Sequence, residues 1–499
     1  MDLSDYEKLC STCDEILLSE CSSLDTIAIP WLHVLNEHPT TLKKYDNVGK
    51  NFKENGKFLL KLLYLFFKNI SLRSFPSFYS SSLKISKSDT LIISHLLNED
   101  QINSKKDFYF GSLSEKLEAD KNKVTVLFLN HTNLTPYEIS TKWNIKGSER
   151  IIFSGKLSFS SEFKLLFKAI NQFFSLKNQS RKIVDNYKKR IYIGASKAAL
   201  TYETISSLRF ILQLNELLVQ IKPKVLLTTL EGHCWERLSY YCARRYNPSI
   251  KCIGYQHAIL FPRQHSIMRS LSNNFDPDLI FTSGLHTKKI MEERCQAYGN
   301  IGIKNIGTHR RADSRVNLNE FTEKKVTPTC LVLPDGNHIE TLNMCEFALK
   351  TAKEIKNIRF IIRLHPLMQT AFILQQNKDF NNIPENLVFS DNSDIQDDFA
   401  KCIWALYRGS GSAIHACIAG LKPIYLKFDD SLSIDPLFMV KDGKKNISVI
   451  AELEKIFIED LSQNIETFAS ELNEVREYCS RYFEPLNLSE VIKEINIDR

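Results

Sequence analysis

The stretch ALYRGSGSAIHACIAGLKPIYL, residues 405–426, places two of the chain's 17 glycines between an apolar strand and an apolar helix. A second apolar strand follows the helix, and strand, helix and strand in this order form the unit of a parallel sheet. Glycine lets a backbone approach a ligand closely, and the start of a helix offers N–H groups without partners. The loop of Ser410, Gly411 and Ser412 is therefore predicted to bind a phosphate. The alternative is a tight turn in which a serine caps the helix.

The same alternation of strand and helix extends over most of the chain. Short apolar runs that predict strands in a first domain occupy residues 89–96, 123–131, 149–155, 190–196, 224–232, 250–257, 278–284 and 303–307. Those of a second domain occupy residues 329–336, 358–366, 386–391, 403–411 and 422–428. The pattern predicts an α/β protein with two doubly wound, Rossmann-like domains that face each other across a cleft.

The predicted boundaries follow changes in composition along the chain. Residues 1–87 read as a helical N-terminal region, 88–315 as the first domain and 316–499 as the second, with a polar, charged linker at 308–326. The 12 cysteines are scattered, and only Cys10 and Cys13 form a CxxC pair, which favours reduced thiols over a zinc site.

Charge and hydropathy exclude some classes of function. The net charge of +7 is small for 499 residues, and no nucleic-acid-binding motif occurs, so we expect no nucleic-acid partner. The first twenty residues lack a secretory signal, and no long uncharged apolar run occurs, which predicts a cytoplasmic protein. The most apolar stretch, 57–72, is interrupted by Lys61 and Lys68 and could lie on an anionic membrane surface or form a buried packing helix. The basic stretch 177–190 could contact anionic lipid or form a solvated face.

Two further strand ends of the second domain carry polar residues. Arg363 and His365 stand in the sequence IIRLHP, where Pro366 ends the strand, and both side chains are good donors to phosphoryl oxygens. Gly336 and Asn337 follow the first strand of this domain, where a loop often faces the ligand. Simple turns are the alternative at both places.

In the first domain the predicted catalytic residues are Glu231 and His257. Glu231 follows the strand KVLLTTL, and a carboxylate at that position can take a proton from an acceptor hydroxyl. Glu236, five residues later, is a second candidate or an acid that stabilises the start of a helix. Gln256 and His257 end the next strand, and His95 ends the first, so we expect all three to contact the substrate or to form hydrogen-bonded core pairs. Asp276 and Asp278 precede a strand, which places them at the wrong end of the sheet for a metal-bound nucleotide.

An acid followed by glycine at a strand end, a His-Pro pair and a downstream serine loop together resemble the bacterial sialyltransferases and Kdo transferases of the GT-B fold. The resemblance implies that Glu231 is the catalytic base and that His365, Ser410 and Ser412 bind the phosphate of a CMP-sugar. Two features depart from the sialyltransferase motifs: Leu230 replaces the first of two acids, and Gly411 separates the serines. The His-Pro and serine-loop pairing also resembles CDP-polyol phosphotransferases, which likewise bind a cytidine nucleotide.

The segment from Leu230 to Leu260 is similar to a family of bacterial surface-carbohydrate biosynthesis proteins in which a Glu, a Trp-Glu and a Tyr-Gln-His recur. These resemblances imply a glycosyltransferase that moves an acidic 2-keto-deoxy sugar, of the Kdo or sialic acid type, from CMP to a glycan or glycolipid acceptor in capsule or lipopolysaccharide synthesis. We expect no metal and no other cofactor. The alternatives are a CDP-polyol phosphotransferase, a sugar-nucleotide epimerase and a catalytically silent scaffold.

Overall fold

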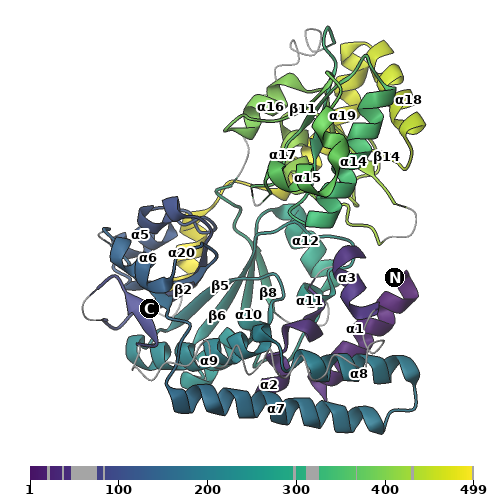
Figure 1. Cartoon of the computed structure of the whole chain (residues 1–499). Helices are drawn as coiled ribbons and strands as arrows, with labels where there is room; N and C mark the ends of the chain where they lie inside the picture. The colour runs from purple at the N-terminus through teal and green to yellow at the C-terminus, as the bar shows by residue number, and fades with distance from the viewer. Residues whose placement is uncertain are drawn as a thin grey trace.

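The computed structural model describes residues 1–19, 23–35, 39–46, 76–82, 85–145, 147–295, 299, 301–310, 325–366, 368–428 and 432–496. The apolar segment 57–72 and most of the predicted linker, residues 311–324, lie outside these ranges. Two sheets, each covered by helices, form the two lobes seen in Figure 1. The predicted GT-B arrangement of two doubly wound α/β domains is confirmed.

The first sheet has eight strands in the order β1-β4-β3-β2-β5-β6-β7-β8. All neighbours pair in parallel except β1, which runs antiparallel to β4. Apart from the edge strands, these strands are almost continuously buried, as expected for a parallel sheet with helices on both faces. Their bounds are β1 Phe78–Ser80, β2 Thr90–Leu96, β3 Val124–Asn130, β4 Glu149–Phe153, β5 Val225–Thr229, β6 Lys251–Gln256, β7 Leu279–Thr282 and β8 Gly302–Asn305.

Helices of the first domain cross between these strands. They are η3 Glu99–Asn103, α5 Leu113–Ala119, α6 Pro136–Lys142, α7 Phe159–Arg181, α8 Asn186–Ala198, α9 Tyr202–Ile221, α10 Cys234–Tyr246, α11 His265–Met268 and α12 Leu285–Arg294. The strand predicted at residues 190–196 is wrong, because this segment lies within α8. Asp185 caps the helix by accepting a hydrogen bond from the Lys188 N–H, and the buried residues that follow recur at helical spacing.

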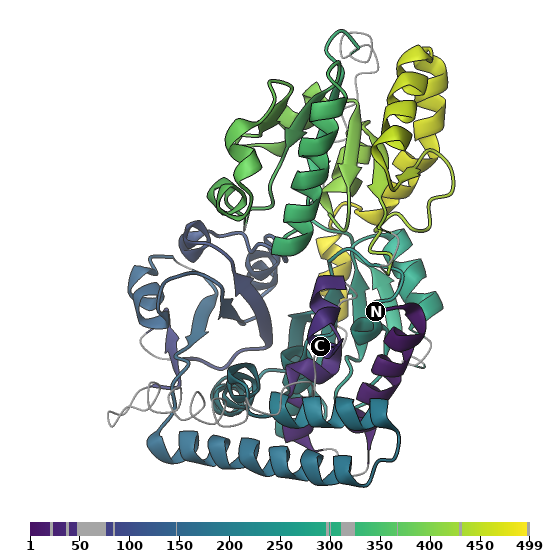
Figure 2. The same cartoon turned by 45° about the vertical axis from the view of Figure 1, so that its right-hand side comes forward.

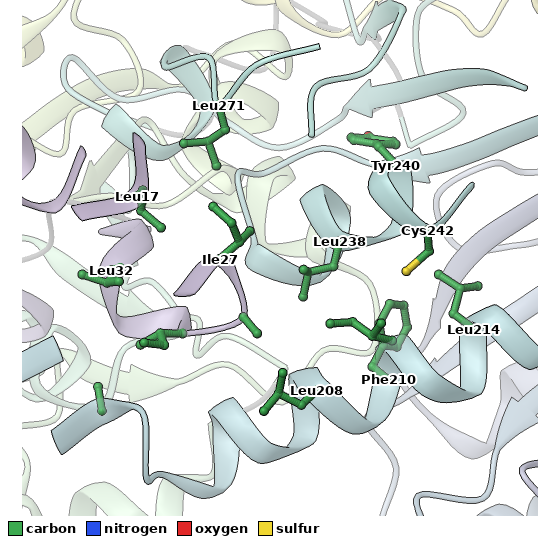
Figure 3. Close-up of a cluster of buried hydrophobic side chains, with 14 of the residues drawn as sticks. Leu17, Ile27, Leu32, Leu208, Phe210, Leu214, Leu238, Tyr240, Cys242 and Leu271 are labelled. Carbon is green, nitrogen blue, oxygen red and sulfur yellow. The ribbon is translucent and has the colours of Figure 1, made fainter. Parts of the chain in front are cut away.

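The N-terminal helices belong to the core of the first domain. They are α1 Leu3–Leu18, α2 Leu24–Ile27, η1 Pro30–His33 and α3 Pro39–Asp46. Leu17, Ile27 and Leu32 share one apolar cluster with Leu208 of α9 and Leu238 of α10, as Figure 3 shows. Cys10 and Cys13 are buried in the same cluster. Within the described residues, the helices before residue 47 are packed into the core of the first domain, and residues 78–80 form its edge strand β1.

The second sheet has six parallel strands in the order β11-β10-β9-β12-β13-β14. The strands are β9 Thr329–Leu333, β10 Arg359–Ile362, β11 Leu387–Phe389, β12 Trp404–Tyr407, β13 Lys422–Leu426 and β14 Lys445–Ile447. The helices are α14 His338–Glu354, α15 Thr370–Gln376, η5 Lys378–Asn382, α16 Ile395–Lys401, α17 Ser412–Ile418, α18 Ile450–Ser462 and α19 Ile465–Tyr482. The short edge strands β14 and β1 were not predicted from the sequence.

The last helix returns to the first domain, which corrects the predicted second-domain range of 316–499. In α20, Leu488–Asn496, Val491 and Ile495 join the apolar cluster that covers the sheet beside α5. The yellow helix among the first-domain elements in Figure 1 is this segment. The chain crosses back just after α19, where the Thr308 N–H donates to the Glu484 carbonyl.

Each sheet reverses its strand order once, and ligands of doubly wound sheets bind at that point, beyond the carboxyl ends of the strands. In the first sheet the reversal lies between β2 and β5, and in the second between β9 and β12. The lobes meet through an apolar cluster that includes Leu260 and Met291 of the first and Tyr407 and Tyr482 of the second. Figure 2 shows the second lobe above the first from another side.

None of the helices in the described part of the chain is both long and apolar enough to cross a membrane.

Candidate active site

Glu231 and His257 form a pair at the carboxyl edge of the first sheet. Glu231 follows β5, beside the point where the strand order reverses, and His257 follows the neighbouring β6. The His257 Nε2 atom lies 3.0 Å from Glu231 Oε1, and the imidazole is 5% exposed while the carboxylate is 36% exposed. The sequence prediction thus placed two residues, 26 positions apart, that the fold brings into contact. A carboxylate held by an imidazole and open on one side can accept a proton.

Three more histidines surround this pair. His233 Nε2 lies 3.8 Å from the second Glu231 oxygen. His95, at the end of β2, shares a hydrogen bond of 2.8 Å with His131 and one of 3.1 Å with the Thr229 hydroxyl. His131 and His233 were not predicted, although His131 directly follows β3 and so repeats the pattern of a histidine at a strand end. These residues turn the edge of four neighbouring strands into one polar site.

Aromatic side chains line the site. The Tyr109 ring centroid lies 4.1 Å from that of His257 and 5.3 Å from that of His95, and Trp235 meets His95 edge to face at 5.6 Å. Such rings exclude water and hold the imidazoles in place. Tyr109 comes from the loop after η3, which carries no motif that the sequence reveals.

The environment sets different protonation states within the cluster. Burial raises the pKa of Glu231, but the close imidazoles of His233 and His257 outweigh it and hold that pKa well below its usual value. Burial, together with the charge of the neighbouring His131, lowers the pKa of His95 to about 3. Burial also lowers the pKa of His257, against the opposing effect of Glu231. Burial lowers the pKa of His233, but Glu231 and Glu236 stabilise its charged form more strongly. The His233 pKa is therefore raised above its usual value. The site therefore holds an ionised carboxylate at neutral pH.

Glu236 builds the loop that presents Glu231. It is fully buried, and its carboxylate accepts hydrogen bonds from the backbone N–H groups of Glu231, Gly232 and His233 at 2.8–3.0 Å. Glu236 therefore stabilises the start of α10, as the alternative for this residue proposed. Its buried, hydrogen-bonded carboxylate is not accessible to a substrate. Burial is the main cause that raises the Glu236 pKa to about 7.

Gln256 is likewise an internal residue. It is fully buried, and its amide donates to the Ala258 carbonyl, so it shapes the turn that leads from β6 past His257. The predicted substrate contact of Gln256 is replaced by this structural role.

Loops after three neighbouring strands of the second sheet converge. A methyl group added at Gly336, after β9, would lie 3.2 Å from the His365 Nδ1 atom, after β10, so the imidazole packs closely against the Gly336 backbone. Burial lowers the pKa of His365, which keeps the ring neutral. Asn337 caps α14, because its side-chain oxygen accepts from the N–H groups of Ile339 and Glu340. Asn337 therefore shapes the loop, as the turn alternative proposed.

The two arginines of this edge point into the protein. Arg408 is fully buried and donates to Glu340 at 2.9 Å and to the Leu426 carbonyl at 3.2 Å. Arg363 donates to the buried Asp398 carboxylate at 3.1 Å and to the Ser390 hydroxyl at 3.2 Å. Arg363 therefore braces the loop after β11, and the predicted phosphate contact gives way to this role.

The serine loop lies against the first domain. Gly409 has a φ of +72°, which favours glycine, and α17 begins at Ser412. A methyl group added at Gly411 would lie 3.2 Å from the Ile259 Cγ2 atom, two residues beyond His257. The serine loop of the second sheet therefore lies beside the loop that follows His257 in the first.

Arg310 stands between the lobes and was read only as part of the linker. Its guanidinium lies 4.8 Å from the Phe108 ring centroid and 5.5 Å from that of Tyr109. Its positive charge contributes to the lowered pKa of His257 and, after burial, to that of His415 on α17, which falls to about 4. Arg310 is thus close enough to act on both sides of the site, and no sequence pattern marks it.

Among the residues that the structure describes, no three His, Cys, Asp or Glu side chains are grouped to hold a metal ion. Asp276 and Asp278 lie before β7, as predicted, where they pair with Arg237 and Arg244.

No protein-family model matches the chain, and no curated protein matches its sequence. Many solved structures are similar to it, among them the following three. UDP-GlcNAc 2-epimerase from Neisseria meningitidis bound to UDP-GlcNAc has 11% identity and a TM-score of 0.47, covering 82% of this chain and 100% of its own. The glycosyltransferase SnogD from Streptomyces nogalater has 11% identity and a TM-score of 0.42, covering 83% and 100%. Anabaena HepE in complex with UDP and glucose has 9% identity and a TM-score of 0.42, covering 82% and 99%.

Proposed function

We propose that the chain is a glycosyltransferase that moves an acidic 2-keto-deoxy sugar from its CMP form to a hydroxyl of a glycan or glycolipid acceptor, in bacterial surface-polysaccharide synthesis. The observation that carries the proposal is the contact between Gly411 and Ile259. It joins a loop suited to phosphate with the Glu231–His257 pair, so a donor held by one lobe can meet a proton acceptor held by the other.

The chemistry of the second-domain edge supports a donor with one phosphate. Its neutral imidazole, serine hydroxyls and loop N–H groups can donate hydrogen bonds to a singly charged phosphodiester. Arg363 and Arg408 are already paired with carboxylates, so they do not add the two positive charges that a diphosphate would favour. His365, Ser410 and Ser412 would stabilise the charge that develops on the CMP leaving group.

The first-domain edge supports transfer to a hydroxyl. Glu231 would take the acceptor proton as the new glycosidic oxygen–carbon bond forms and the bond from the sugar to the CMP phosphate breaks. His257 and His233 would keep Glu231 ionised until then. Arg310, between the lobes, is placed to pair with the carboxylate of an acidic sugar.

A nucleotide screen by thermal denaturation tests the proposal. At a nucleotide concentration 100 times its Kd the unfolding free energy rises by about 2.7 kcal/mol, so CMP and CDP should raise the Tm by several degrees. UDP and GDP should not. A CMP-sugar and a glycan acceptor should then release CMP. Stabilisation by UDP alone would favour the epimerase alternative, and release of CMP from a CDP-polyol would favour the phosphotransferase.

A further inference from the structure

A basic groove lies between α7 and α8. It has a volume of about 540 Å³, and its lining includes the apolar side chains of Phe173 and Ile193. Both views place the two helices along the end of the first domain that is remote from the second (Figures 1 and 2). The groove is therefore separate from the site between the lobes.

Five cations line this groove. Of the described carboxylates, none lies within ion-pair distance of any of them. Arg181 donates to Asn178, and Arg190 and Lys177 lie over the rings of Tyr187 and Phe173. Such a concentration of positive charge around an apolar surface attracts anionic amphiphiles. The five are Lys177, Arg181, Lys189, Arg190 and Lys197.

A row of exposed aromatic side chains continues from the groove along α7. Phe159, Phe163, Phe167 and Phe174 are each between 51% and 58% exposed. With 3.6 residues per turn, their spacing places them on one face of the helix. Phe174 is in edge-to-face contact with Phe173 of the groove, at 5.1 Å between ring centroids. Large apolar residues on one helix face beside basic residues are typical of helices that lie in a membrane interface.

We propose that the α7–α8 face binds the surface of an anionic phospholipid membrane. The phenylalanine row enters the boundary between headgroups and acyl chains, and the five cations contact lipid phosphates around the groove. The membrane then lies at the end of the first domain opposite the second, so the site between the lobes stays accessible from the other side. This inference does not depend on the proposed function.

Vesicle co-sedimentation of the full chain tests it. Vesicles of phosphatidylcholine with about 30% phosphatidylglycerol should bind the protein, vesicles of phosphatidylcholine alone should bind it much more weakly, and high salt should release it. Replacing Lys177, Lys189 and Lys197 by Ala should lower the partition coefficient about 100-fold, and replacing Phe167 and Phe174 by Ser should lower it at least tenfold. Both variants should keep the wild-type Tm, because they change exposed or half-buried side chains.

Matched variants on the second domain serve as controls. Lys350 and Lys353 on α14 and Lys356 just after it are exposed, as are Val449 and Ile458 at α18. Changing these to Ala or Ser, respectively, should leave vesicle binding unchanged. The proposal is overturned if anionic vesicles bind no better than neutral ones, or if both α7–α8 variants bind like the wild type. It is also overturned if the phenylalanine variant converts a dimer to a monomer without vesicle binding in either form, since a second copy would then cover the row.

Discussion

The carboxyl edges of the two sheets carry opposite kinds of chemistry. At the first edge an ionised carboxylate, Glu231, is partly open and is held by two imidazoles. At the second edge the charged groups, Arg408 and Arg363, are paired with carboxylates, and the neighbouring loops carry the His365 imidazole, two serine hydroxyls and glycines. The same strand-loop-helix unit thus presents an ionised carboxylate in one lobe and a neutral imidazole beside a serine loop in the other.

The difference shows that a charged residue near a strand end is not by itself a ligand contact. A buried charge must be paired, so a nearby carboxylate from another element directs where an arginine points. Glu231 remains available because its partners are imidazoles, His257 with a lowered pKa and His233 with a raised pKa, and its side chain is still 36% exposed. Substitutions at Glu231 should therefore change activity, whereas substitutions at the paired arginines should change stability.

The largest effect is expected from Glu231→Gln. The amide cannot accept the acceptor proton, so kcat should fall by about 100- to 10,000-fold while the KM for the CMP-sugar changes little. Steady-state CMP release with a saturating acceptor measures both constants. Glu292→Gln, a change at an exposed carboxylate on α12, is the matched control and should retain full activity. Full activity of Glu231→Gln would show that Glu231 is not the general base, and the proposed difference between the two edges would then be wrong.

Arg408→Met should unfold the protein more readily and should not act on the ligand directly. The change leaves the buried Glu340 without its partner, which costs about 3–5 kcal/mol of unfolding free energy. The double variant with Glu340→Met should recover most of this loss, because both charges are then removed. Urea unfolding of the three proteins gives the free energies. If Arg408→Met kept its stability and lost CMP binding, the arginine would face the nucleotide.

Much of this architecture could be predicted from the sequence, because apolar runs with turn residues after them mark parallel strands. Polar residues interrupt those runs at the ends of β5, β6, β9, β10 and β12. The sequence therefore predicted the candidate residues at all five strand ends. The prediction of a strand at residues 190–196 was wrong because two isoleucines in a short run fit a strand as well as a buried helix face. The cap at Asp185 was the signal that favoured a helix.

What could not be predicted depends on contacts between distant residues. Glu340 is 68 positions from Arg408, and Asp398 is 35 positions from Arg363, so no local pattern reveals that these arginines are already paired. The same holds for Arg310, which reaches the site only because the lobes meet beside it. The return of α20 to the first domain is a third case, since its apolar face fits any uncovered sheet.

His365→Ala tests the neutral cradle and should have a moderate effect. Loss of one hydrogen bond to a phosphate weakens CMP binding about tenfold, with little change in Tm. Isothermal titration with CMP measures the Kd. The exposed His338, on the same edge, is the matched control, and His338→Ala should bind CMP like the wild type. Equal Kd values for all three proteins would show that the nucleotide does not contact the second edge at this loop.

The smallest effect is expected in the pKa values of His233 at the first edge and His365 at the second. Both can be measured by NMR titration of protein labelled at the imidazole carbons. His233 should remain protonated to a higher pH than an ordinary histidine, because its pKa is raised by two carboxylates, whereas His365 should lose its proton at a lower pH, because burial lowers its pKa. In Glu231→Gln one of the two carboxylates is gone, so the His233 pKa should fall while that of His365 stays unchanged. The sign follows from charge alone, since removing a negative neighbour destabilises the protonated ring. A shift of equal size at both histidines would mean that the substitution alters the whole protein and not the electrostatics of the first edge.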